Sequence, residues 1–219
     1  MLRAMHKTAN KARDLRARTS PLRTFIATAT LLATALLLLS AVGPAVDAIQ
    51  APPQKRPEAA QLAPYVPTPQ EVVDRMLQLA TVGKNDVVYD LGCGDGRIPI
   101  TAAKAYGARG VGVDIDPQRI AEANANAKQA GVSHLVSFRL QDAMTVELSD
   151  ATVVTLYLLS SSNLKLRPIL TKQLKPGARI VSHAFSMGDW QADKVDTFND
   201  TAGNRRTLYL WKTDGKVRP

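Results

Sequence analysis

The sequence predicts an α/β fold: a doubly wound, mostly parallel sheet of seven strands that ends in an antiparallel strand pair. The first observation is an apolar run at 87–89 that ends in an acid, Asp90, and is followed by glycines on alternate positions. The second is a helix-length segment, 97–106, that leads to another apolar run ending near Asp114. The third is that strand-like and helix-like segments go on alternating along the chain, which is typical of a parallel sheet.

The other elements follow from local signals. Before the first strand, a helix is expected over 70–80, with Thr68 as its N-cap, Pro69 in its first position and Glu71 completing a capping box. Thr207, Tyr209 and Trp211 alternate with Leu208 and Leu210, which predicts a strand. The expected strands after the first two are 135–140, 151–159, 178–185, 194–198 and 206–212, and the expected later helices are 118–130 and 164–174.

One α/β domain and an N-terminal extension account for the 219 residues. Residues 65–219 hold the predicted sheet, 49–64 form a linker rich in proline and alanine, and 1–48 form a leader. The net charge of +9 lies mainly in the leader, because residues 1–24 contain seven basic residues and one acid, a net +6. The remaining +3 is mild and argues against a body that binds nucleic acid.

The leader has the pattern of a targeting segment. Residues 24–46 contain no charged side chain, follow a basic stretch, and precede a small-residue cleavage pattern at 46–48. We expect a secretory signal peptide or an uncleaved membrane anchor, so that the domain is exported or anchored to a membrane. A mitochondrial presequence is the alternative, because residues 1–24 are rich in arginine and poor in acids.

The glycine turn indicates which cofactor the domain binds. The dinucleotide fingerprint would place its third glycine at position 97, but Arg97 stands there and the third glycine is Gly96. The resulting spacing, D-x-G-x-G-x-G, resembles the first motif of class I S-adenosylmethionine-dependent methyltransferases, which have a Rossmann-like fold. An acid after the second strand suits ribose hydroxyls, and one after the third suits an adenine amino group. The expected cofactor-binding residues are Tyr65, Thr68, Asp90, Gly92, Cys93, Gly94, Gly96, Asp114, Ile115 and Asp142.

Other kinds of chemistry are disfavoured. Cys93 is the single cysteine, so an intrachain disulfide is excluded, and its position suits a small turn residue better than a nucleophile. Three histidines and one cysteine provide no cluster at zinc-ligand spacing, so no metal is expected. The fourth strand is followed by Ser-Ser-Ser-Asn, not by the Asn/Asp-Pro-Pro-Tyr/Phe motif of enzymes that methylate DNA adenine. We therefore expect no nucleic-acid substrate.

Three stretches resemble the protein-lysine methyltransferases that modify the mitochondrial ATP synthase c-subunit and the adenine nucleotide translocase. They are YVPTP at 65–69, DLGCGDGRI at 90–98, and GARIV at 177–181, which is followed by Phe185 and Trp190. The resemblance implies a protein substrate with a target lysine, and membrane proteins are among the substrates it suggests. Two features depart from the mitochondrial enzymes: the fourth-strand exit at 157–159, and Ala184, where those enzymes carry an arginine.

The acceptor side is less well marked than the cofactor side. Phe185 and Trp190 follow the fifth strand, and Tyr65 and Thr68 precede the first helix, so we expect all four to border the acceptor channel. No unique general base is visible; Asp189 and His183 are the candidates. Two alternatives to a lysine methyltransferase stay open: a methyltransferase for small molecules or lipids at the membrane, and a non-catalytic cofactor-binding module.

Overall fold

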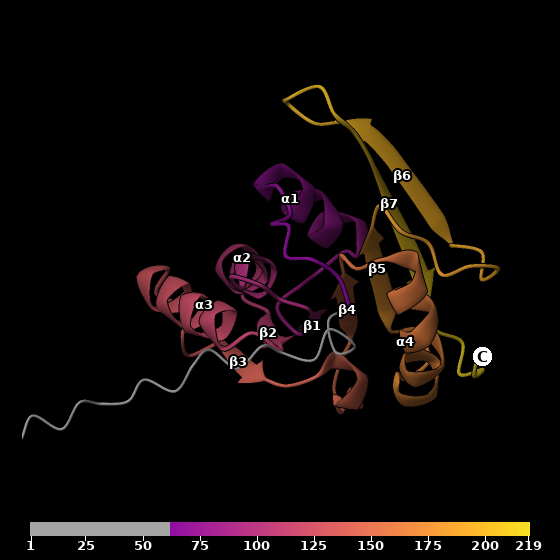
Figure 1. Ribbon diagram of the computed structural model, residues 1–219, viewed down its shortest axis with the longest axis horizontal. Helices are drawn as coiled ribbons and strands as arrows, with labels where there is room; N and C mark the ends of the chain where they lie inside the picture. Colours follow the sequence, from indigo (N-terminus) through magenta and orange to yellow (C-terminus); the bar gives the residue numbers. More distant parts are fainter. Residues whose placement is uncertain (1–61) are drawn as a thin grey trace, which may run out of the picture. The chain divides into compact units, whose positions relative to one another are not determined.

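A seven-stranded sheet forms the centre of residues 62–219, which are the residues that this computed structural model describes (Figure 1). The expected leader, 1–48, and most of the linker, 49–64, lie outside the described residues. The strand order is β3-β2-β1-β4-β5-β7-β6; β1 to β5 are parallel, and β7 is antiparallel to both β5 and β6. The strands are β1 (Val87–Leu91), β2 (Arg109–Asp114), β3 (Val136–Leu140), β4 (Val153–Leu156), β5 (Arg179–His183), β6 (Lys194–Asn199) and β7 (Arg205–Lys212).

The helices cover the two faces of the sheet unequally. One face carries α1 (Gln70–Leu79), α2 (Arg97–Tyr106) and α3 (Pro117–Gln129), while α4 (Ser160–Gln173) and the short 3₁₀ helix η2 (Ala143–Thr145) lie on the other. None of these helices within 62–219 is long and apolar enough to cross a membrane. Both faces of β1 are buried, which accounts for its continuous apolar character.

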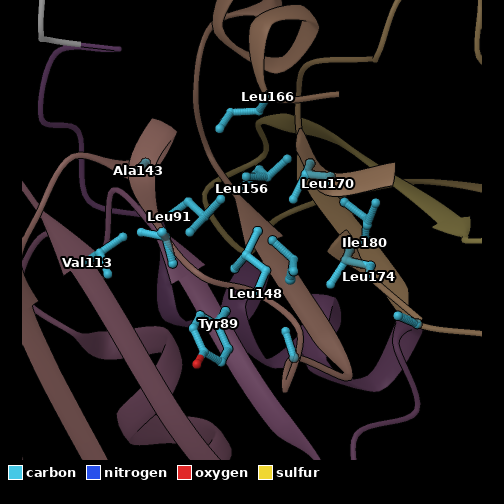
Figure 2. Packing of buried hydrophobic residues seen from close by; sticks show 14 of the residues in the cluster. Tyr89, Leu91, Val113, Ala143, Leu148, Leu156, Leu166, Leu170, Leu174 and Ile180 are labelled. Atoms are coloured by element: carbon cyan, nitrogen blue, oxygen red, sulfur yellow. The ribbon is translucent and has the colours of Figure 1, made fainter. Parts of the chain in front are cut away.

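The main core lies between the sheet and α4. Figure 2 shows Leu91 of β1, Leu156 of β4 and Ile180 of β5 in one cluster with Leu166 and Leu170 of α4, and all of these residues are buried. On the opposite face, Met76 and Leu77 of α1 are fully buried against a second cluster. Burial of a side chain of this size stabilises the fold by roughly 1.5–3 kcal/mol, so the two clusters hold the strand ends in fixed positions.

Three expectations are wrong: the cap of α1, the start of α4, and the end of the fourth strand, which was expected at 159 but lies at Leu156. Pro69, not Thr68, caps α1: its carbonyl accepts hydrogen bonds from Val72 and Val73. Glu71 completes no capping box, because its carboxylate accepts from the backbone N–H of Thr201. α4 begins at 160, not at 164, since the polar segment that looked like a loop forms the first helical turn.

The topology brings four strand ends together. The chain runs outward from β1 through β2 to β3, then returns to β4 on the other side of β1. The strand order therefore reverses between β1 and β4, and crevices at such points are where open α/β sheets bind ligands. Asp90, Asp114 and Asp142 belong to β1, β2 and the segment after β3, as the sequence predicts.

Candidate functional site

A pocket lies along the C-terminal ends of β1 to β4, with about 880 Å³ of empty space, part of it open to solvent. Its walls come from the loops after the four strands and from residues 62–68, which we call the strap. Nine of the ten expected cofactor-binding residues line it: Tyr65, Thr68, Asp90, Gly92, Cys93, Gly94, Asp114, Ile115 and Asp142.

Gly96, the tenth, has a packing role. Its φ of +78° lies in the left-handed region, and a Cβ there would come within 2.6 Å of the Phe138 ring and 2.8 Å of the Ala123 Cβ. Glycine therefore lets the start of α2 approach β3 and α3 closely. Gly92 and Cys93 hold the other end of the turn, because both backbone N–H groups donate to the Val113 carbonyl at 2.9 Å.

Asp114 ties the glycine turn to the end of β2. One carboxylate oxygen accepts from the Gly94 N–H and the other from the Asp116 N–H, both at 2.9 Å. Each oxygen has a second lone pair, so the same carboxylate can also accept from ribose hydroxyls in the pocket that it lines. Asp114 therefore supports the loop and faces the ligand position.

Asp90 is a buried acid at the end of β1, with 3% of its surface exposed. The pKa of Asp90 is raised to about 7, mainly by burial and also by the nearby charges of Asp114 and Asp95, while a hydrogen bond from Thr155 opposes the rise. A positively charged ligand would favour ionised Asp90. The residue thus suits a pocket for a cationic cofactor.

The raised pKa of Asp90 predicts a pH-dependent stability. An acid whose folded pKa, about 7, exceeds its ordinary value of 3.8 holds its proton longer in the folded state, so stability falls as pH rises between these values. The slope is at most about 1.4 kcal/mol per pH unit. In urea unfolding without cofactor, the free energy of unfolding of Asp90→Asn should exceed that of the wild type by an amount that grows from pH 4 to 7 and stays constant above pH 7. A difference independent of pH would contradict this.

Asp142 has two roles in the structure. One carboxylate oxygen accepts from the Met144 N–H at 2.9 Å and so caps η2, yet the residue also lines the pocket. Ile115, directly after β2, also lines the pocket. This end therefore offers an acceptor and an apolar surface for an adenine.

Cys93 is unsuited to nucleophilic chemistry. Its side chain is buried, and burial raises the pKa of the thiol far above its ordinary value, with Asp90, Asp114 and Asp95 adding to the rise. The thiolate is the reactive form, and this environment suppresses it. The reading of Cys93 as a small turn residue agrees with its contacts: its sulfur would lie 2.7 Å from a Cβ at Gly112.

Two arginines that sequence reasoning missed hold the strap over the pocket. Arg97 donates to the Thr68 carbonyl at 2.8 Å and pairs with Asp95 at 2.5 Å. The Arg119 guanidinium lies 4.4 Å from the centre of the Tyr65 ring, which covers Gly94 so closely that a Cβ there would be 2.5 Å away. The sequence contained one signal for Arg97, which directly follows the third glycine of the turn.

Tyr157 closes the β4 end of the pocket, and two other aromatic rings lie beside it. Tyr157 follows β4 and lines the pocket, and its ring lies 4.1 Å from the His183 ring and 6.4 Å from the Phe185 ring, centre to centre. His183 is 1% exposed; burial lowers its pKa to about 4, and the charge of Arg206 adds to this. Asn163 donates to the Phe185 carbonyl at 3.1 Å and so fixes the chain after β5.

The remaining candidate residues lie outside the pocket wall. Asp189 is exposed and ion-paired with Arg167, whose hydrogen bond lowers its pKa. Trp190 packs on Trp211 with ring centres 5.9 Å apart, and Arg218 covers its ring at 4.4 Å. Trp190 and Phe185 stay predictions for the acceptor side. Among residues 62–219, no group of three or more His, Cys, Asp or Glu side chains is placed to hold a metal ion.

Comparisons with known proteins agree with this site. Residues 90–194 match the family described as ANTKMT methyltransferase domain. A protein-lysine N-methyltransferase of Saccharolobus islandicus is 49% identical over 149 residues, which cover 68% of this chain and 92% of that protein. The adenine nucleotide translocase lysine N-methyltransferase of Mus musculus is 33% identical over 128 residues, 58% of this chain and 56% of that protein. The chain thus spans just over half the length of the mouse relative.

One similar solved structure contains a bound ligand. An RNA methyltransferase from Salinibacter ruber, in complex with S-adenosyl-L-homocysteine, is 54% identical, with a TM-score of 0.65. The match covers 70% of this chain and 97% of that one. The chain is therefore a class I S-adenosylmethionine-dependent methyltransferase and belongs to the family of the adenine nucleotide translocase and ATP synthase c-subunit lysine methyltransferases.

Proposed function

We propose that this methyltransferase acts on lysine side chains of proteins. The observation that carries the proposal is the 49% identity to a protein-lysine N-methyltransferase of which the chain covers 92%. The acidic and aromatic lining of the pocket supports it, since both kinds of group attract a lysine ammonium. The proposal concerns only the group that receives the methyl group. The assignment of S-adenosylmethionine as the cofactor rests separately on the family and on the pocket.

The residues of the pocket suit S-adenosylmethionine in a definite order along the sheet edge. Asp142 would accept from the adenine amino group, Asp114 from the ribose hydroxyls, and the glycine turn would meet the methionyl part near Asp90. A Cβ at Gly94 would fill space held by Tyr65, so the turn and the strap form a close cradle. When bound, the cofactor supplies an electrophilic methyl group on a positively charged sulfur.

The protein's own contribution is orientation and exclusion of water. The strap, held by Arg97 and Arg119, covers the ligand position, and Tyr157 and Leu158 form an apolar wall at the β4 end. A lysine amine must be neutral to attack, and a dry wall favours its neutral form. Asp189 and His183 lie outside the pocket wall, the first ion-paired and the second buried, so no side chain is assigned as the base.

RNA is the second candidate acceptor, because the Salinibacter ruber structure is described as that of an RNA methyltransferase. The pocket wall disfavours a polyanion: it contains Asp90, Asp95, Asp114, Asp116 and Asp142. Its two arginines already face partners, Asp95 and Glu122. A lipid or small-molecule acceptor at the membrane is the third candidate.

The acceptor class can be tested with a radiolabelled methyl group. The full chain, in detergent, is incubated with labelled S-adenosylmethionine and a cell extract, which is then divided among protease, ribonuclease and lipid-extraction treatments. The proposal is supported if protease releases the label and the ribonuclease and lipid-extraction treatments leave it in place. Label lost to ribonuclease or to the lipid extract would overturn it, and Asp114→Ala serves as the control for enzymatic transfer.

We infer further that the leader takes the enzyme to a membrane. Residues 24–46 are uncharged and follow a basic stretch, a pattern that supports a signal or anchor segment and also permits mitochondrial import. A methyl acceptor at or near a membrane would fit either destination. Fractionation of cells that express the full chain tests this, and recovery in the soluble fraction alone would contradict it.

Removal of the leader is expected to change location and leave the fold intact. A variant lacking residues 1–50 should be soluble and bind S-adenosylmethionine with the affinity of the full chain, because a Pro/Ala-rich linker separates the apolar run from the domain. Calorimetric titration of both proteins provides the comparison. Aggregation of the shortened protein, with the full chain well behaved in detergent, would show that the leader is needed to cover the domain.

A further inference from the structure

The strand order shows which end of the pocket is the reacting end. Four neighbouring strands of the sheet are β3, β2, β1 and β4, in that order (Figure 1). Asp142 follows β3, Asp114 ends β2, the glycine turn follows β1, and Tyr157 follows β4. With adenine near Asp142 and ribose near Asp114, the sulfonium lies toward β1 and β4. Tyr157 therefore stands at the end where the methyl group leaves.

Tyr157 is held in place by a buried histidine. The two rings are 4.1 Å apart with planes inclined at 32°, and His183 is 1% exposed. Within the described residues, no hydrogen-bond partner reaches the buried Nδ1 of His183. A buried nitrogen without a partner lowers stability, so hydrogen bonding at Nδ1 does not account for a histidine here. What the ring does provide is a flat surface beneath Tyr157.

A second support comes from the segment after β5. The Phe185 ring lies 6.4 Å from the Tyr157 ring with planes inclined at 29°. The Phe185 carbonyl is fixed by hydrogen bonds from Ser182, at 2.6 Å, and from Asn163, at 3.1 Å. Tyr157 thus has two aromatic neighbours, one at the last residue of β5 and one in the loop directly after it, and both rings limit its orientation at the pocket wall.

We propose that Tyr157 is the wall that faces the positive charge during transfer, and that His183 is the positioning residue that keeps its ring there. In the reaction, the nitrogen–carbon bond forms as the sulfur–carbon bond breaks, and the positive charge moves from sulfur to nitrogen. An aromatic face stabilises a cation on either atom. The spent cofactor is neutral, so the same wall holds it less strongly than the charged one. The role of the sulfonium follows from the cofactor assignment, and only the role of the amine rests on the proposed lysine acceptor.

The charge preference can be measured without an acceptor. The full chain in detergent is titrated with S-adenosylmethionine, with neutral S-adenosylhomocysteine and with sinefungin, an analogue that carries an amine near the methyl position. For Tyr157→Leu, we expect the two cationic ligands to bind about five- to thirty-fold more weakly and S-adenosylhomocysteine to bind within two-fold of wild type. Tyr157→Phe keeps the aromatic face and should keep all three affinities.

The His183 variants separate positioning from general stability. His183→Phe keeps a flat ring and removes the unpartnered nitrogen, so it should preserve the preference for cationic ligands and raise the melting temperature. His183→Ala removes the ring and should lose part of the preference, even where S-adenosylhomocysteine binding shows that the protein is folded. The proposal is overturned if Tyr157→Leu weakens the binding of all three ligands equally or of none of them. If Tyr157→Leu does not fold, the same criterion applies to His183→Ala. These titrations contain no acceptor, so failure of the lysine proposal would leave their outcome unchanged.

Discussion

Replacing Asp114 by alanine is expected to weaken binding of S-adenosylmethionine by about 1.5–3 kcal/mol, the range for hydrogen bonds to a charged group. The carboxylate accepts from the backbone of Gly94 and of Asp116, and it lines the pocket at the position expected for ribose. Its loss removes contacts to the ligand and frees the glycine turn. Calorimetric titration of the full chain measures the change directly.

Asp189→Ala is the matched control. This acid is exposed, pairs with Arg167 and lies outside the pocket wall, so its removal should leave cofactor affinity within two-fold of wild type. Unchanged affinity in Asp114→Ala would show that another group holds the ribose. Loss of methyl transfer in Asp189→Ala, with cofactor binding intact, would make that acid a catalytic candidate again.

Gly96→Ala is expected to lower the free energy of unfolding by about 2–5 kcal/mol. A left-handed backbone costs a non-glycine residue roughly 1–2 kcal/mol, and overpacking typically adds 1–3. The added methyl would lie 2.6 Å from the Phe138 ring and 2.8 Å from the Ala123 Cβ, so α2 or α3 must move. Urea unfolding without cofactor gives the value.

Gly131→Ala separates strain from crowding. Gly131 has a similar φ of +73°, but nothing lies within 4 Å of its Cβ position, so it should lose only the strain part, about 1–2 kcal/mol. Equal losses in the two variants would mean that packing at Gly96 is not tight. A greater loss at Gly96 would support close helix–strand contact as the reason for its glycine.

The fold and the cofactor side of the site were predictable because they depend on local patterns. Apolar runs that end in acids marked β1 and β2, and parallel strands bring their ends to the same edge, so Asp90, Asp114 and Asp142 converge there. The capping of α1 was misjudged because Thr68 is drawn into the pocket wall, where its carbonyl accepts from Arg97. That contact spans 29 positions, and no local pattern reveals it.

The acceptor side was harder to predict because it depends on how distant strands pair. β7 returns antiparallel beside β5, which brings Trp211 against Trp190 and His183 level with Leu208. His183 becomes buried beside Tyr157 as a result, although the sequence presents it as a base candidate. Tyr157 drew attention only as part of a strand exit that departs from the mitochondrial enzymes.

The chemical identity of the methylated product tests the central claim most directly. The full chain is incubated with labelled S-adenosylmethionine and a protein extract, and the labelled protein is hydrolysed to its amino acids and separated by chromatography. We predict that the label elutes with Nε-methylated lysine and is absent when Asp114→Ala replaces the wild type. Label in a methylated nucleoside, in a lipid or in an amino acid other than lysine would contradict the assignment of this enzyme as a protein-lysine methyltransferase.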